Sequence, residues 1–115
     1  MEKRDRLRST RDFQKVYREK NSLYNREFTI YMRKNDLGYP RFGFSISKKI
    51  GKANVRNLLK RRLREIIRLN RHVFDKDYDY VIIPRPKTRD MEYKDLEKSL
   101  LHCYMRSKKS KRKKK

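Results

Sequence analysis

Residues 45–71 read SISKKIGKANVRNLLKRRLREIIRLNR, and the rest of the chain is organised around this stretch. It begins as a short alternating strand, turns at Gly51 and continues with the periodicity of an amphipathic helix. Leu58 and Leu69 flank its apolar side. The residues that share this side are Val55, Leu59, Leu63, Ile66 and Val73. The pattern predicts a helix that packs on a sheet.

The opposite side of this helix is strongly basic. Its polar residues are Asn57, Lys60, Arg64, Arg68 and Arg71, bordered by Arg56 and Arg61. Glu65 is the single acid among them, whereas a merely solvated helix face usually mixes both signs of charge. Because uncompensated repulsion costs stability in the free protein, we interpret this side as an anion-binding surface. The lysines that lead into the helix N-terminus, where the helix dipole favours a phosphate, are Lys48, Lys49 and Lys52.

The whole chain is basic. Its 115 residues include 36 Lys and Arg against 14 Asp and Glu, which gives a formal net charge of +22. This excess is beyond what solubility requires, so the partner must be strongly anionic, either nucleic acid or a membrane surface. The length fits one domain, which we place at residues 1–106, followed by a disordered basic tail at 107–115. We expect the free protein to be a monomer.

Cysteine usage and hydropathy bear on the location of the protein. The lone Cys103 excludes an internal disulfide and suits a reducing compartment. No apolar run is long enough for a membrane span or a signal peptide. We therefore expect a cytoplasmic protein, and no membrane partner, because the basic helix uses its apolar side on the sheet.

The other elements follow from local patterns. Ser9 and Asp12 form a plausible capping box for a helix over residues 10–18, after a basic N-terminal arm with little structure. The segment 21–26 is interpreted as a polar connection, and the turn at 35–38 as a link between neighbouring strands. Strands are predicted at 27–33, 41–47 and 80–84, the last central or doubly covered, and a final helix begins near Thr88 or Asp90.

Aromatic residues allow two interpretations. Phe13 and Tyr17, one helical turn apart, belong either to the core or to a platform on which unpaired bases stack. The predicted strand 41–47 places Gly43, Ser45 and Ser47 on one side, which indicates an open polar floor. Tyr31 would stand over this floor, where a strand of nucleic acid could lie.

Catalytic motifs are absent from the sequence. It contains no Walker loop, no zinc-ligand spacing and no paired carboxylates. His102 beside Cys103 is interpreted as a helix-packing position. Asp75, Asp77 and Asp79 do not form a calcium loop, because no Gly follows and a proline occupies the place of the bidentate Glu. The residues therefore predict a binding protein that carries no cofactor of its own.

Several stretches resemble the bacterial ribonuclease P protein subunit. Residues 47–65, SKKIGKANVRNLLKRRLRE, are similar to its signature, in which an Arg-Asn-Arg core follows Ser-Lys-Lys and a Gly turn. Residues 6–17, RLRSTRDFQKVY, look like the opening helix of that family, and residues 80–86, YVIIPRP, look like its last strand. Leu58 is a departure, because it stands at the last position of the Arg-Asn-Arg core.

The resemblance implies a fold and a function. The fold would be an α+β sandwich with a small mixed four-stranded sheet, the element order αβββαβα and a left-handed crossover between parallel strands. In that family's enzyme the RNA subunit is the catalyst and requires Mg²⁺, and the reaction removes the 5′ leader of precursor tRNA. The protein would be the accessory subunit of this endoribonuclease, with the catalytic RNA and precursor tRNA as partners.

The resemblance also implies site residues. The leader of precursor tRNA would be bound by Phe13, Tyr17 and Tyr31. The catalytic RNA would be bound by Lys48, Lys49, Lys52, Arg56, Asn57, Lys60, Arg61, Arg64 and Arg68. The alternative is a structural RNA-binding protein, such as a ribosomal protein, which the charge and the basic tail fit equally well.

Overall fold

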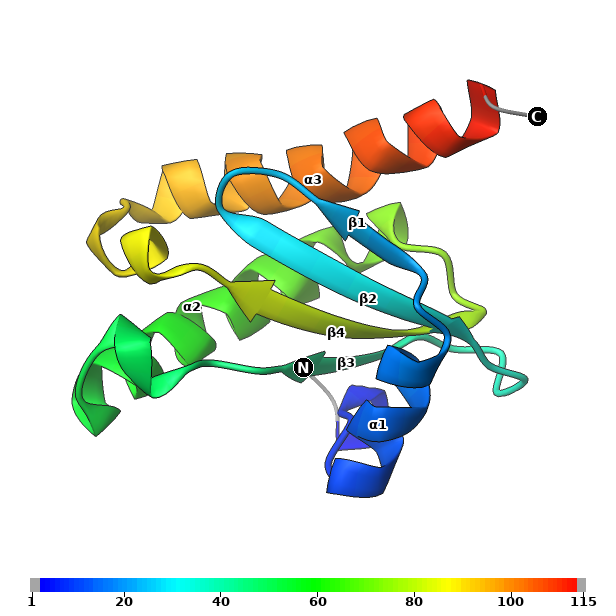
Figure 1. The fold of residues 1–115 in the computed structure, drawn as a ribbon, viewed down its shortest axis with the longest axis horizontal. Coiled ribbons are helices and arrows are strands. Elements are labelled where there is room, and N and C mark those ends of the chain that lie inside the picture. The colour runs from blue at the N-terminus through cyan, green and yellow to red at the C-terminus, as the bar shows by residue number, and fades with distance from the viewer. Residues whose placement is uncertain (1–2, 114–115) are drawn as a thin grey trace.

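The computed structural model describes the backbone of residues 3–113 and the side chains of residues 3–105. Its helices are α1 (Thr10–Arg18), α2 (Ala53–Asn70) and α3 (Tyr93–Lys113). Its strands are β1 (Ser22–Tyr24), β2 (Phe28–Lys34), β3 (Arg41–Phe44) and β4 (Tyr78–Pro84). The order αβββαβα is therefore confirmed, and Figure 1 shows the strands between α1 and α3.

The four strands form one mixed sheet in the order β1-β2-β4-β3. β4 pairs antiparallel with β2 and parallel with β3, and α2 makes the connection between the parallel pair. The central place of β4 confirms the interpretation of its continuous apolar run. The prediction that the turn at 35–38 joins neighbouring strands is wrong, because β4 inserts between β2 and β3. The hand of the crossover stays a prediction.

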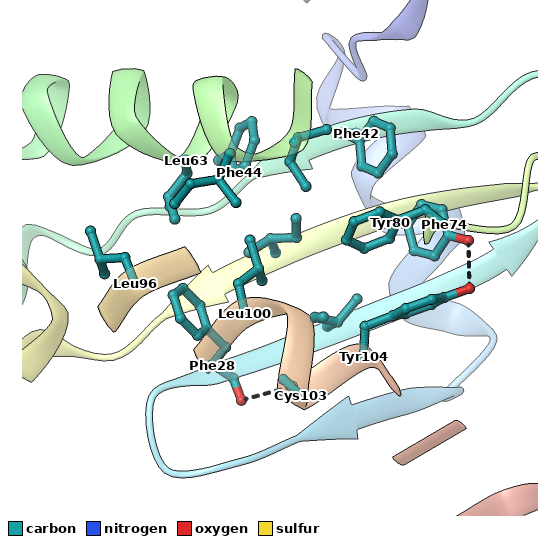
Figure 2. Packing of buried hydrophobic residues seen from close by; sticks show 14 of the residues in the cluster. Phe28, Phe42, Phe44, Leu63, Phe74, Tyr80, Leu96, Leu100, Cys103 and Tyr104 are labelled. Carbon is teal, nitrogen blue, oxygen red and sulfur yellow. Dashed lines mark hydrogen bonds between the residues drawn. The ribbon is translucent and has the colours of Figure 1, made fainter. Parts of the chain in front are cut away.

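Helices α2 and α3 cover one face of the sheet. The residues that these two helices bury there are Leu59, Leu63, Ile66, Ile67, Leu96, Leu100, Cys103 and Tyr104. They meet strand residues such as Phe28 and Tyr80, as Figure 2 shows. Leu58 and Leu69, at the flank of the apolar side, are 41% and 50% exposed. The apolar side of α2 thus packs on the sheet as its periodicity predicts.

Helix α1 covers part of the opposite face. The Oγ of Ser9 accepts a hydrogen bond of 3.1 Å from the backbone N–H of Asp12, and the helix has the predicted bounds. Val16 is fully buried against Val81 of β4 and against Leu7. One end of this face is therefore closed by α1 and by the segment that precedes it.

The N-terminal segment is more ordered than the sequence indicates. Leu7 is buried, and its N–H donates to the carbonyl oxygen of Phe42 at 2.9 Å. The buried carboxylate of Asp5 pairs with Arg71 at the end of α2, with an Nε–Oδ2 distance of 3.1 Å. The expectation of an arm with little structure is wrong, because a buried leucine and a buried ion pair anchor it. Arg71 is thereby engaged in the fold, and its side chain stays 40% exposed.

Several boundaries differ from the sequence-based expectations. Helix α3 begins at Tyr93 and not near Thr88 or Asp90, because Pro86–Asp90 form a 3₁₀ helix, and β4 begins at Tyr78. Part of the predicted connection 21–26 is strand β1, which buries Leu23 and pairs in register with β2. The predicted strand 41–47 ends at Phe44, because a 3₁₀ turn over Lys48–Ile50 follows closely. Helix α3 extends to Lys113, so the backbone of residues 107–113 is helical, whereas a disordered tail was expected there. Lys and Arg are good helix formers, and no Gly or Pro interrupts this segment.

A buried polar network fixes the loop between β2 and β3. The carboxylate of Asp79, 1% exposed, accepts two hydrogen bonds from Arg41, at 2.9 and 2.7 Å, and one from Asn35 at 2.8 Å. These bonds raise the pKa of the Arg41 guanidinium. The Oδ1 of Asn35 in turn accepts from the N–H of Leu37 at 3.1 Å. The network satisfies a buried carboxylate and ties the loop to β4.

Candidate RNA-binding surfaces

Three aromatic side chains from α1 and β2 form what we call the aromatic surface, defined as Phe13, Tyr17 and Tyr31. All three are half-buried, whereas Val16 between the helical pair is fully buried. The rings of Tyr17 and Tyr31 meet edge to face, with centroids 5.1 Å apart and planes at 88°. The aromatic residues thus pack on one another and still present ring area to solvent, which a base can use for stacking.

Gly43 determines how closely α1 approaches the sheet. A Cβ at this position would lie 2.5 Å from Cζ of Phe13, so the Phe13 ring would have to move to admit any side chain. The prediction of an open floor of Gly and Ser is therefore wrong at Gly43, which is buried beneath the Phe13 ring. Glycine permits this approach because it has no Cβ. Ser45 is half-buried and Ser47 is exposed, so the floor opens only beyond β3.

Helix α2 and the turn before it form the basic surface, defined as the nine residues predicted to bind catalytic RNA. Its exposed members are Lys48, Lys49, Lys52, Asn57, Arg61 and Arg68. Its half-buried members are Arg56, Lys60 and Arg64. These residues lie on one element and on the 3₁₀ turn that leads into it, so the fold holds their charges on a rigid support.

Two members of the basic surface have local partners. The Nε of Arg56 donates to the carbonyl oxygen of Gly51 at 3.2 Å, which ties the turn to the first turn of α2. Arg68 donates to Glu65 through Nε at 3.0 Å, and this ion pair raises the pKa of Arg68 and lowers that of Glu65. The pair is exposed and contributes little to stability. It neutralises part of the charge at the C-terminal half of the helix.

A pocket of about 280 Å³ connects the aromatic and basic surfaces. Its lining includes Phe13, Gly43 and four cationic residues. The cationic residues are Arg6, Arg8, Lys60 and Arg64. Burial, and then the charges of Arg64 and Arg6, lowers the pKa of Lys60, and burial followed by the charge of Arg6 lowers that of Arg64. The pocket concentrates positive potential that an anion would relieve.

Arg6 and Arg8 were not among the predicted site residues. Both come from the N-terminal segment, which reaches the pocket because Arg6 bridges to Phe42 in a parallel β-bridge. The signal in the sequence is Leu7 between two arginines, because one apolar residue in a basic segment indicates an anchor. The pairing of that anchor with β3 is a long-range contact that no local pattern contains.

The Cys103 and His102 pair does not form a nucleophile and base. Cys103 is fully buried and donates to the carbonyl oxygen of Phe28 at 3.7 Å, whereas His102 is exposed. Burial raises the pKa of the Cys103 thiol to about 12. Among the described residues, no three His, Cys, Asp or Glu side chains form a metal-ligating cluster. No helix in the described part of the chain is long and apolar enough to cross a membrane.

Comparisons with known proteins agree on one family. The family model described as Ribonuclease P matches residues 1–108. The ribonuclease P protein component of Finegoldia magna is 48% identical over 102 residues, which cover 89% of each chain. That of Thermotoga maritima is 48% identical over 85 residues, covering 74% of this chain and 73% of the relative.

Solved structures give the same result. The RNase P protein from Thermotoga maritima superposes with a TM-score of 0.79 at 40% identity, covering 84% of this chain and 92% of that one. A mutant RNase P protein from Staphylococcus aureus superposes with a TM-score of 0.84 at 34% identity, covering 94% and 92%. The α+β fold and the resemblance carried by residues 47–65 are thereby confirmed. The chain belongs to the ribonuclease P protein family.

Proposed function

We propose that the chain is the protein subunit of ribonuclease P and supports RNA-catalysed removal of the 5′ leader from precursor tRNA. The observation that carries the proposal, in a chain of this family, is that an aromatic and a basic surface meet at one cationic pocket. Phe13 belongs to the first surface, Lys60 and Arg64 belong to the second, and all three line the pocket. A substrate strand and a structured RNA can therefore be held side by side.

The basic surface would bind the catalytic RNA. Lys and Arg side chains on a rigid helix meet phosphates by charge, and folded RNA presents phosphates and 2′-hydroxyls rather than readable base edges. The exposed side chain of Arg61 can adjust to a phosphate, whereas the Arg56 guanidinium is fixed by its hydrogen bond to the carbonyl oxygen of Gly51. This binding would depend on shape and on salt concentration more than on sequence.

The aromatic surface would bind the leader. Stacking on an aromatic ring tolerates every base, because each base has a π-face. Tyr17 and Tyr31 would each offer ring area, and the cationic pocket beside Phe13 would attract the backbone of the same strand. The leader would therefore be held without a strict requirement for its sequence.

The chemistry would belong to the RNA subunit, whose Mg²⁺ ions activate water at the scissile phosphodiester. The contribution of this chain would be to bind and position the RNA strands, without a nucleophile or general base of its own. The same proposal includes a monomeric free protein and a cytoplasmic location. The monomeric state is supported by the charge of +22, because copies of the chain repel one another in the absence of RNA.

The test is cleavage of a 5′-extended precursor tRNA by a bacterial ribonuclease P RNA at low Mg²⁺, with and without the protein. We expect cleavage at the mature 5′ end only when both are present. Tyr31→Ala should weaken binding of precursor tRNA but not of leaderless tRNA, whereas Leu37→Ala, an exposed residue in the β2–β3 loop, should change neither. Absence of stimulation by a folded protein that binds the cognate RNA would favour a structural RNA-binding protein instead.

A further inference from the structure

The sheet register places Tyr24 on the face that carries Tyr31. Tyr24 of β1 pairs with Thr29, two residues from Tyr31 on β2. Leu23 beside it is buried in the opposite face with α3, so the side chain of Tyr24 projects toward the α1 side. Diagonal neighbours of this kind lie about 7–8 Å apart. The two tyrosines are therefore adjacent positions on one surface.

Helix α1 covers this part of the sheet only in part, because Ile83 packs against the cluster beneath the helix whereas Tyr24 on the edge strand is exposed. The row of the sheet that runs through Tyr31, Val81 and Gly43 lies beneath α1, whose residues pack on it. The next row on the same face runs through Tyr24, Thr29 and Ile83. Tyr24 is 69% exposed, the highest value among the large apolar side chains in the described part of the chain. Because this large aromatic ring is exposed at the edge of the aromatic surface, a base can stack on it.

Two arginines stand beside this ring. Tyr24, Asn25, Arg26 and Arg85 line a pocket of about 450 Å³, and both arginines are exposed. The backbone N–H of Arg85 donates to the backbone carbonyl oxygen of Glu27 at 2.9 Å, and this bond holds the end of β4 against the β1–β2 turn. The pocket thus combines one aromatic face with two guanidinium groups, the combination that suits a nucleotide.

The turn that carries these groups is held in place by the core. The Oδ1 of Asn25 accepts from the N–H groups of Glu27 and Phe28 at 3.0 and 2.8 Å, and its Nδ2 donates to the carbonyl oxygen of Ser99 at 3.0 Å. The neighbouring acid Glu27 is paired with Lys87, with an Nζ–Oε2 distance of 2.7 Å. Its charge is therefore compensated, and the pocket keeps a net positive charge.

We infer that Tyr24, Arg26 and Arg85 form a further subsite for one unpaired nucleotide of the leader strand. This inference rests on the proposed function and extends it by one position. The base stacks on the Tyr24 ring, and the adjoining phosphates meet the two guanidinium groups. The distance between the diagonal positions of Tyr24 and Tyr31 is about twice the 3.4 Å rise of a stacked strand. Each ring therefore binds a different base, and the bound strand is unstacked between them.

The experiment uses the holoenzyme assembled from the catalytic RNA and the full chain. Binding is measured for precursor tRNAs of increasing leader length, and for long leaders in which a single abasic nucleotide is moved along the leader. Tyr24→Ala is expected to weaken binding of long leaders by about five- to tenfold and to leave short leaders unaffected. It should also abolish the effect of an abasic nucleotide at one leader position, and Tyr24→Phe should restore that effect.

Matched variants separate this subsite from its surroundings. Tyr31→Ala should remove the abasic effect at a different leader position, and Leu37→Ala, 45% exposed, should remove none. Arg85→Ala should reduce the salt dependence of binding for long leaders but not for leaderless tRNA. Because Tyr24 is exposed, Tyr24→Ala should unfold at nearly the wild-type temperature, which excludes a folding defect.

The outcomes distinguish the inference from the proposed function. If Tyr24→Ala binds every leader as the wild type does while Tyr31→Ala is weakened, the further subsite does not exist and the proposed function stands. If the wild type shows no dependence on the leader at all, the proposed function itself fails. A loss in Tyr24→Ala that is equal for leaderless tRNA would place Tyr24 against another part of the complex and would also overturn the inference.

Discussion

Replacing Gly43 with alanine tests how the aromatic surface is built. The added Cβ would lie 2.5 Å from Cζ of Phe13 and 3.0 Å from Cβ of Leu7. Leu7 is buried and bonded through its backbone, whereas the Phe13 ring is half-exposed at the end of a flexible side chain. We therefore expect the ring to move outward while the N-terminal segment stays in place.

Two opposing effects set the magnitude. Overpacking of this kind costs about 1–3 kcal/mol. Alanine also restricts the unfolded chain, which stabilises by about 0.4–1 kcal/mol where the backbone suits it, and Gly43 is not among the glycines with positive φ. The net loss for Gly43→Ala should be about 1–2 kcal/mol. When Phe13 is already alanine, the main clash is gone and the same change should be almost neutral.

Urea unfolding of the wild type, both single variants and the double variant measures this coupling. We expect a coupling energy of about 1–2 kcal/mol between Gly43 and Phe13. Gly43→Ala should also weaken binding of leader-bearing tRNA to the holoenzyme without changing the binding of leaderless tRNA. Equal losses in free energy of unfolding with and without the Phe13 ring would refute the close approach of α1 to the sheet.

Three further predictions concern the core and the basic surface. Arg41→Ala should lower the free energy of unfolding by about 3 kcal/mol, because it removes the guanidinium partner of the buried Asp79 carboxylate; urea unfolding measures it, and a change as small as that of Glu65→Ala would contradict it. Burial raises the thiol pKa of Cys103 from 9.0, its value in the unfolded chain, to about 12 in the fold. The buried neutral thiol therefore contributes its full stabilisation below the unfolded pKa, and this contribution is lost as the pH rises toward the folded pKa. Relative to Cys103→Ala, the wild type should thus lose up to about 1.4 kcal/mol of unfolding free energy per pH unit above about pH 9. Urea unfolding at about pH 8 and about pH 10.5 measures this loss, and a difference between the two proteins that stays constant would exclude it. Leu58→Arg should strengthen binding to the catalytic RNA and steepen its salt dependence by about one charge, because Leu58 is 41% exposed; an unchanged slope in a salt titration would show that no phosphate lies there.

Local patterns predicted the elements whose signals are contained within a few turns of chain. The bounds of α1 follow from the Ser9 cap, and the apolar side of α2 follows from its period. Strand β1 was not predicted, because three residues are too short to show alternation and only Leu23 among them is buried. The position of β4 between β2 and β3 depends on pairing between distant segments, which a turn sequence does not specify.

The candidate site shows the same division. Periodicity placed Lys60 and Arg64 on one side of a helix, and the structure places both on the pocket. Arg6 reaches that pocket only through its bridge to Phe42, so its place was not predictable from nearby residues. The spacing of Phe13 and Tyr17 did not decide whether they belong to the core or to the surface. In the structure both side chains are half-buried, so each packs in the fold and also contributes to the surface.

The position of β4 has a consequence for the synthesis of the protein. Strands β2 and β3 are not hydrogen-bonded neighbours and are joined in the sheet through β4, which leaves the ribosome after both of them. During translation at about 5–20 residues per second, the earlier segments must wait several seconds in total before the sheet can close. The nascent chain therefore carries its basic helix before it has a completed sheet to support it. Assembly of the surface that carries the aromatic and basic residues is in this way coupled to the synthesis of β4.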